Sequence, residues 1–207
     1  MLELFSDMDR LFFIKTKYNI GDTKYLVIGD TYVPMQIAAF DKDVLSSDGV
    51  STAKITWISK GASFTFPFSI ISDSNGNKWE DCGCREFLRS TVYNNINPIV
   101  KNRIVDVFKT SKNYINEITT SDNIWIPSKR EAGFASGIES EGDVYTDYFN
   151  PEDTSTRKVE GIYSGSPRLW WTRTGNSSTN IFMTDGVASS NTSPTNPQGI
   201  VIGFCTN

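Results

Sequence analysis

The segment RLWWTRTGNSSTNIFMTDGVASSN, residues 168–191, places two tryptophans and two arginines beside a run of small polar residues. Side chains of adjacent strand residues point to opposite faces, so Trp170 and Trp171 do not both face solvent if this segment is a strand. Burying a tryptophan removes up to about 250 Å² of surface from water, which favours at least one of the two as a core residue. The Asp-Gly pair at 185–186 marks a tight turn. The segment therefore predicts a strand, a polar loop and a hairpin.

Composition narrows the class of protein. A length of 207 residues suits one large domain, with or without an appended arm. Aromatic residues make up 13% of the chain, which favours sheet over helix. The formal charge is −4 and no run of Lys and Arg forms the basic stripe of a nucleic-acid-binding protein. Histidine is absent, so an enzyme here would depend on carboxylates, Lys, Tyr or Cys.

Targeting and cofactor signals are missing from the sequence. No N-terminal segment has the basic start and small-residue cleavage site of a secretion signal, and no apolar run approaches the ~20 residues of a membrane span. We therefore expect synthesis in a cytoplasm and no membrane span. The three cysteines are an odd number, and Cys-Gly-Cys at 82–84 lacks the spacing of redox or zinc sites. Buried free thiols are expected, with no metal and no cofactor.

The middle of the chain predicts two helices. The first has an apolar face at positions i, i+3, i+4 and i+8. The residues of this face are Cys84, Phe87, Leu88 and Val92. In the second helix, Asn97 suits the N-cap and Pro98 the first helical position. Further on, a short strand is expected to end at Pro127, and Ser128 and Glu131 have the spacing of a capping box that opens a brief helix.

Short strands dominate the rest of the prediction. They are expected in AKITWISK (53–60), LWWTRT (169–174), NIFMT (180–184) and GIVIGFC (199–205). The predicted fold class is α+β, a single domain with short mixed or antiparallel strands, two central helices and long C-terminal loops. Residues 1–18 are either a first core element or an arm that docks on a partner, and residues 19–207 form the domain. The expected core aromatic residues are Trp57, Trp125, Trp170 and Trp171.

Two runs of Ser, Thr and Asn accompany the late strands, at 174–180 and 188–199. These side chains offer hydrogen-bond donors and acceptors without charge, which suits sugars and adaptable surface recognition. Ordinary solvated turns have the same composition, so both interpretations stay open. The predicted ligand face consists of Arg173, Asn176, Ser177, Ser178, Asn180, Asn191, Thr195 and Asn196.

Acidic residues cluster at 41–43, 139–143 and 150–153. None of these clusters has the spacing of a calcium-binding loop, so each is predicted to be a solvated loop. A glycosidase needs two carboxylates a short distance apart in a cleft, and nothing in the spacing points to such a pair. No catalytic residue is therefore assigned, although a carbohydrate-active enzyme with a carboxylate pair stays open as an alternative.

Taken in order, these segments resemble one family. The motifs that carry the resemblance are YVPMQIAAFD, AKITWISK, REFLRSTVYNNINPIVKNRIVDVFKTS, SDNIWIPSKRE, WWTRT and GIVIGFC. The family is an uncharacterised domain, often with a WWLRS, SDG and GVRPA signature, common in surface proteins of Gram-positive bacteria and in their bacteriophages. The resemblance spans about residues 19–205 and is strongest to the phage-encoded branch. Here WWTRT replaces WWLRS and GIVIGFC replaces GVRPA, so no side-chain role is transferred at those positions.

The family resembles C-type-lectin-like domains, which implies C-terminal loops that form a recognition face. It implies a virion structural protein, on the capsid or the tail, that adheres to a host surface or glycan and is not an enzyme. Other virion proteins, bound through the N-terminal arm, are the implied partners, and homo-oligomerisation and a bacterial surface module stay open. The calcium-dependent sugar motifs of lectins are absent, as are the paired late cysteines of formylglycine-generating enzymes.

Overall fold

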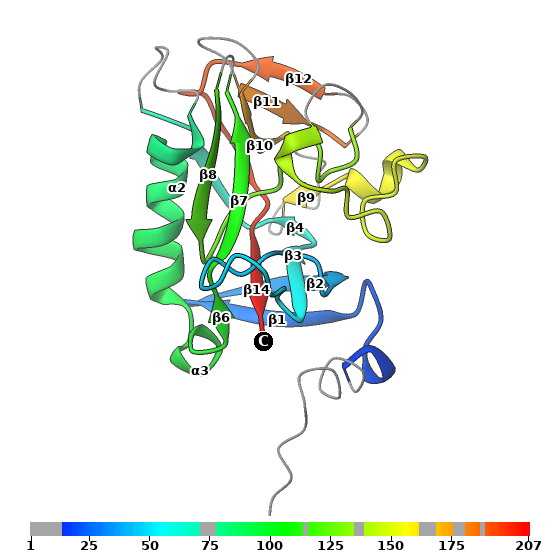
Figure 1. Ribbon diagram of the computed structural model, residues 1–207. Helices are drawn as coiled ribbons and strands as arrows, with labels where there is room; N and C mark the ends of the chain where they lie inside the picture. The colour runs from blue at the N-terminus through cyan, green and yellow to red at the C-terminus, as the bar shows by residue number, and fades with distance from the viewer. Residues whose placement is uncertain are drawn as a thin grey trace, which may run out of the picture.

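Strands dominate this mixed α+β fold, and two five-stranded sheets with a helical segment beside them form its framework (Figure 1). The expected α+β class is confirmed. The computed structural model describes residues 14–70, 78–113, 116–134, 139–161, 169–175, 181–186 and 189–207, without the side chains of 139, 181–183, 189 and 190. No helix among these residues is long and apolar enough to span a membrane.

The first sheet has the strand order β1-β2-β3-β14-β6, and all its neighbouring strands are antiparallel. Its strands are β1 (Thr23–Ile28), β2 (Thr31–Phe40), β3 (Ile55–Ser59), β14 (Gly203–Thr206) and β6 (Ile104–Val105). Strand β3 is buried on both faces except at Trp57, so it lies inside the molecule rather than at a wet surface. Strand β14 lies between β3 and β6 and so joins the end of the chain to its first half.

The second sheet has the order β12-β11-β10-β13-β5. Its strands are β12 (Ser189–Thr192), β11 (Ile181–Thr184), β10 (Trp170–Gly175), β13 (Pro197–Ile200) and β5 (Phe64–Pro67). Strands β10 and β13 are parallel, and the other neighbours are antiparallel. The predicted hairpin is confirmed, because β11 pairs with β12 across the connection that contains Asp185 and Gly186. The predicted single strand GIVIGFC is instead two strands, β13 and β14, in different sheets.

Two short strand pairs connect these sheets to the rest of the fold. Strands β4 (Gly61–Ala62) and β9 (Glu160–Gly161) are parallel, and β7 (Val107–Lys112) and β8 (Glu117–Asp122) form an antiparallel hairpin. The strand predicted to end at Pro127 ends earlier, because β8 ends at Asp122 and the segment after it makes an isolated bridge between Trp125 and Gly203. There the tryptophan ring lies against the glycine, where a Cβ would approach Cζ3 of the ring to 2.4 Å.

Both predicted central helices are present. The first is a continuous run of α2 (Gly83–Phe87), η2 (Leu88–Val92) and η3 (Tyr93–Asn95), which the extended Cys82 separates from the preceding 3-10 turn η1 (Trp79–Asp81). The second helix is α3 (Pro98–Lys101). Cys84, Leu88 and Val92 are buried as their spacing predicts. The Asn97 side chain accepts a hydrogen bond from the Ile99 amide at 2.9 Å and is the predicted N-cap.

The capping box that the sequence predicts at residues 128–131 is confirmed. The amide of Ser128 donates to Glu131 Oε2 at 3.0 Å, and the amide of Glu131 donates to Ser128 Oγ at 2.9 Å. The segment forms a turn rather than a helix, and short 3-10 turns η4 (Glu139–Glu141) and η5 (Thr154–Arg157) follow it. Cys82, Cys84 and Cys205 are free and buried. Burial raises the pKa of the Cys82 thiol to about 12, so that thiol stays protonated.

Candidate functional site

The predicted ligand-face residues lie in two different environments. Asn191, Thr195 and Asn196 are exposed in or just after β12, the outer strand of the second sheet. There Asn196 Nδ2 donates to Thr192 Oγ1 at 2.8 Å. The prediction for Asn176, Ser177, Ser178 and Asn180 lies outside the described residues. Arg173, in contrast, lies in β10 and is buried, with only 1% of the residue exposed to solvent.

Three of the four tryptophans expected in the core lie fully inside it. Trp125, Trp170 and Trp171 are each at 0% exposure, whereas Trp57 is only partly buried against the core. Trp171 Nε1 donates to the carbonyl of Phe66 at 2.9 Å, which joins β10 to β5 across the sheet. Strand β10 is therefore buried on both faces, and its polar residues Thr172, Arg173 and Thr174 are buried with the tryptophans.

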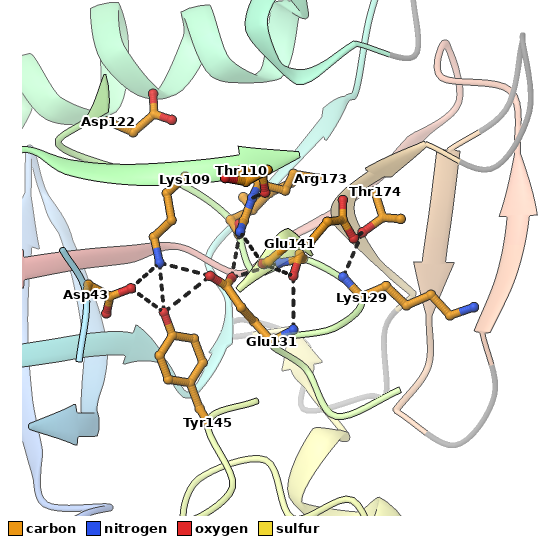
Figure 2. Close-up of polar contacts among 12 residues, drawn as sticks. Asp43, Lys109, Thr110, Asp122, Lys129, Glu131, Glu141, Tyr145, Arg173 and Thr174 are labelled. Carbon is orange, nitrogen blue, oxygen red and sulfur yellow. Dashed lines mark hydrogen bonds and ion pairs between the residues drawn. The ribbon is translucent and has the colours of Figure 1, made fainter. Parts of the chain in front are cut away.

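The guanidinium of Arg173 is the centre of a buried ion network (Figure 2). Its Nη1 atom lies 2.5 Å from Glu131 Oε2 and donates to the carbonyl of Ile126 at 2.8 Å. The remaining donors meet backbone carbonyls of Thr110 and Glu141 at 3.2 Å. Arg173 thus links β10 to β7, to Ile126 and to the 3-10 turn at 139–141, and its donors are engaged within the protein.

A second cation, Lys109 of β7, completes the network (Figure 2). Its Nζ atom lies 2.5 Å from Asp43 Oδ1, 3.0 Å from Glu131 Oε1 and 2.8 Å from the Tyr145 hydroxyl. The same atom lies 3.6 Å from the centre of the Trp125 ring. Burial alone would lower the pKa of Lys109, but the carboxylates of Asp43 and Glu131 outweigh it and raise that pKa.

The two glutamates of the network have opposite protonation behaviour. Burial favours protonated Glu131, but Arg173 and Lys109 outweigh it and lower its pKa to about 2. Glu141 is also fully buried, and there burial dominates and raises the pKa to about 7. Glu141 Oε1 accepts from the Lys112 amide at 2.7 Å, and Oε2 accepts from Thr174 Oγ1 at 2.6 Å. A hollow of about 300 Å³ is lined in part by both glutamates.

The prediction of solvated acidic loops is wrong for Asp43 and Glu141, which are 8% and 0% exposed. Each is buried because a donor from a distant part of the chain neutralises or hydrogen-bonds its carboxylate. The one sequence signal that pointed into this network is the capping box, since Glu131 belongs to both. Nothing in the local pattern around Lys109 or Asp43 indicates that the two side chains meet, since 66 positions separate them.

A larger and open groove lies elsewhere, with a volume of about 770 Å³. It lies between the start of β2, the β3–β4 connection and the segment 147–161, which is drawn in yellow on the right of Figure 1. Tyr148 contributes an aromatic side chain whose hydroxyl donates to Gln36 Oε1 at 3.2 Å. The exposed polar residues of the groove are Lys60, Asp147, Ser155, Thr156, Lys158 and Glu160. These side chains leave room for a ligand that is rich in hydroxyl groups.

Residues 68–205 match the model of a family described as Domain of unknown function (DUF6273). The match confirms an uncharacterised domain, over a shorter range than the 19–205 indicated by the motifs. It contains Lys109, Glu131 and Arg173, whereas Asp43 and the strands β1 to β5 up to residue 67 precede it. No curated protein and no solved structure matches the chain.

Proposed function

We propose that this chain, which belongs to the DUF6273 family of domains of unknown function, is a non-enzymatic recognition domain of a bacteriophage particle. In this proposal it adheres to a glycan of the host surface, and its fold is of the C-type-lectin-like kind that its motifs resemble. The observation that carries the adhesive role is the open groove of about 770 Å³ with its hydroxyl, amide and charged side chains. The virion location is supported by the resemblance of the sequence to the phage-encoded branch of the family.

The chemistry of the groove favours a polar ligand of low net charge. Lys60 and Lys158 are balanced by Asp147 and Glu160, so no single sign of charge prevails along it. Ser155 and Thr156 add hydroxyl groups, and Tyr148 adds an aromatic surface. Sugar rings use both kinds of partner, since their hydroxyls form hydrogen bonds and their C–H faces pack on aromatic side chains.

Binding of the purified chain to fixed Gram-positive cells and to their extracted wall polysaccharides tests the adhesive role. Thr156→Trp places a large side chain on the groove and is expected to abolish binding without changing the melting temperature. Thr91→Trp is the matched control, because Thr91 is also exposed and belongs to η2, in the helical segment that lies on the opposite side of Figure 1 from segment 147–161. It is expected to bind like the wild type.

The same assay locates the recognition face. If the combined change of Asn191, Thr195 and Asn196 to Ala abolishes binding while Thr156→Trp binds normally, the face lies at the β12 edge instead of the groove. Absence of binding to every host preparation contradicts adhesion. Mass spectrometry of purified particles tests the virion location separately, and a stoichiometric amount of the chain is expected.

A second candidate function is a carbohydrate-active enzyme, and one observation favours it. Glu131 and Glu141 line the same hollow of about 300 Å³, and their pKa values are separated to about 2 and about 7. Such a separation is typical of a carboxylate pair that acts as base and acid. However, both carboxyl groups are engaged with protein donors on each oxygen, and neither residue exceeds 3% exposure. Release of sugar from wall polysaccharide by the wild type, and its loss in Glu141→Gln, would establish this alternative.

A further inference from the structure

The contacts of Lys109 with Asp43 have the arrangement of two reactants. Nζ lies 2.5 Å from Asp43 Oδ1, and the two side chains are only 2% and 7% exposed. Aromatic groups enclose them, with the Trp125 ring centre 3.6 Å from Nζ and the Tyr145 hydroxyl at 2.8 Å. Glu131 Oε1 lies 3.0 Å from the same nitrogen (Figure 2). An amine, a carboxyl group and a second carboxylate are therefore held together and away from water.

We propose that Lys109 and Asp43 condense into an intramolecular isopeptide bond, with Glu131 as the catalytic residue. The Nζ–Cγ bond forms and one Cγ–Oδ bond of Asp43 breaks. Of the three protons of the Lys109 ammonium, one stays on the amide nitrogen and two leave with the departing oxygen as water. The ammonium and the carboxylate thus give one amide and one water, so the step needs neither an external oxidant nor an activating group.

Neighbouring side chains supply the proton path. Glu131 Oε1 is placed to accept a proton from Nζ during the reaction step, because the ammonium that its carboxylate partners favour must lose that proton before the nitrogen can attack. The Tyr145 hydroxyl lies 2.9 Å from Asp43 Oδ1 and 3.5 Å from Glu131 Oε1, so it connects the base to the leaving oxygen. The other oxygen, Asp43 Oδ2, accepts a hydrogen bond from the Thr56 hydroxyl, which stabilises negative charge on it during attack.

Burial favours the amide product over the separate ions. The ion pair holds two charges in the interior, whereas the amide is neutral and the released water can leave to solvent. The remaining charges stay balanced, because Glu131 keeps Arg173 as its partner at 2.5 Å. Rigid placement also replaces the search of two free groups for each other, which removes the entropic part of the barrier.

A second ion pair on strand β7 differs from the Lys109–Asp43 pair in its exposure to solvent. Lys112 lies on the same strand, and its Nζ is 3.8 Å from Glu117 Oε1 with side-chain exposures of 34% and 44%. That pair is accessible to water, which stabilises the separate ions. We therefore expect condensation at Lys109 and none at Lys112. The product would join the loop after β2 to β7 covalently, across 66 positions of the chain.

Intact-mass spectrometry of the denatured full chain tests the proposal. The wild type is expected to be lighter than its sequence by the mass of one water, and a protease digest is expected to contain one branched peptide that joins Asp43 to Lys109. Lys109→Arg is expected to have the full sequence mass, and Lys112→Arg is expected to retain the loss of water. Glu131→Gln is expected to lower the cross-linked fraction measured at a fixed time after purification.

The digest of the wild type decides the matter even if a variant does not fold. A full sequence mass together with an unmodified, linear Lys109 peptide would overturn the proposal. So would a loss of water that persists in Lys109→Arg, since a cyclic imide at an aspartate gives the same mass change. Location of the branch at any other lysine would overturn it as well.

Discussion

The ion network around Arg173 and the open groove beside segment 147–161 use similar side chains in opposite ways. In the network every carboxylate oxygen of Glu131 and Glu141 meets a protein donor, and both residues are almost completely buried. In the groove, charged and hydroxyl side chains such as Lys60 and Thr156 are exposed. The first arrangement engages each of these carboxylate oxygens within the protein, and the second exposes its polar side chains to solvent.

The difference shows that charge in a sequence does not by itself mark a binding site. A buried charge is tolerated only when partners within the protein satisfy it, so the network contributes to the fold and its members depend on one another. Exposed polar residues depend little on one another and remain available for recognition. Substitutions should therefore have large effects on stability in the network and small ones in the groove.

The largest effect is expected for Arg173→Met. It removes one of the two cations beside Glu131 and takes the Arg173 donors away from three backbone carbonyls, so we expect a loss of about 3–5 kcal/mol in the free energy of unfolding. Urea denaturation followed by tryptophan fluorescence measures this. Lys112→Met, which breaks the exposed pair with Glu117, is the control and should cost about 0–1 kcal/mol. Equal losses in the two variants would contradict the distinction between buried and exposed ion pairs.

A somewhat smaller effect on stability is expected at Gly203, which packs against the Trp125 ring beside Lys109. In Gly203→Ala the added Cβ would lie 2.4 Å from Cζ3 of Trp125, the ring on which Lys109 rests. Because that ring is enclosed, we expect destabilisation of about 1–3 kcal/mol from overpacking. Gly83→Ala provides the control, since its nearest neighbour would lie at an ordinary 3.8 Å. Thermal unfolding of both variants checks the prediction, which an unchanged melting temperature for Gly203→Ala would refute.

The pH dependence of stability separates the two glutamates. Glu131 has a pKa lowered from 4.5 to about 2, so its contribution is present above pH 4.5 and is lost as the pH falls toward 2. Glu141 has a pKa raised from 4.5 to about 7, so the native state loses stability as the pH rises from 4.5 to 7. These two groups together predict a maximum near pH 4.5.

Glu141→Gln provides the matched test, because glutamine resembles the protonated acid and keeps an acceptor for the Lys112 amide. In this variant the decrease in the free energy of unfolding from pH 4.5 to pH 7 is expected to become smaller. The decrease as the pH falls below 4.5 is expected to remain, because it comes from Glu131. Urea titrations at a series of pH values give both slopes. If the free energy of unfolding of the wild type does not decrease from pH 4.5 to pH 7, ionisation of Glu141 does not destabilise the native state.

The smallest effect is expected in the groove. Lys60 is exposed there, and Lys60→Ala should change the free energy of unfolding by no more than about 0.5 kcal/mol. The same urea experiment measures it. A loss as large as that in Arg173→Met would mean that the groove belongs to the structural framework.

Local patterns predicted those parts of the fold that depend on near neighbours in the chain. The buried face of the first helix, the Asn97 cap, the reciprocal bonds of Ser128 and Glu131 and the late hairpin are all of this kind. Each depends on spacings of a few residues, where periodicity and capping rules apply.

The ion network was not predicted, because its members come from distant segments. Asp43 and Glu141 occur in acidic clusters that read as solvated, and only their tertiary partners explain their burial. The polar run after the tryptophans suggested that Arg173 would face a ligand, whereas the pairing of β10 on both sides turns its guanidinium inward. The groove was missed for the same reason, since its walls come from β2, the β3–β4 connection and residues 147–161.

Mutual dependence within the network is the central claim, and the free energy of unfolding of one double variant tests it most directly. Arg173→Met leaves Lys109 as the cation shared by two buried carboxylates, those of Asp43 and Glu131, and adding Glu131→Gln removes the excess negative charge while Lys109 keeps Asp43. The double variant is therefore predicted to be at least as stable as Arg173→Met alone. A double variant whose loss equals the sum of the two single losses would contradict the account, because the charges would then act independently.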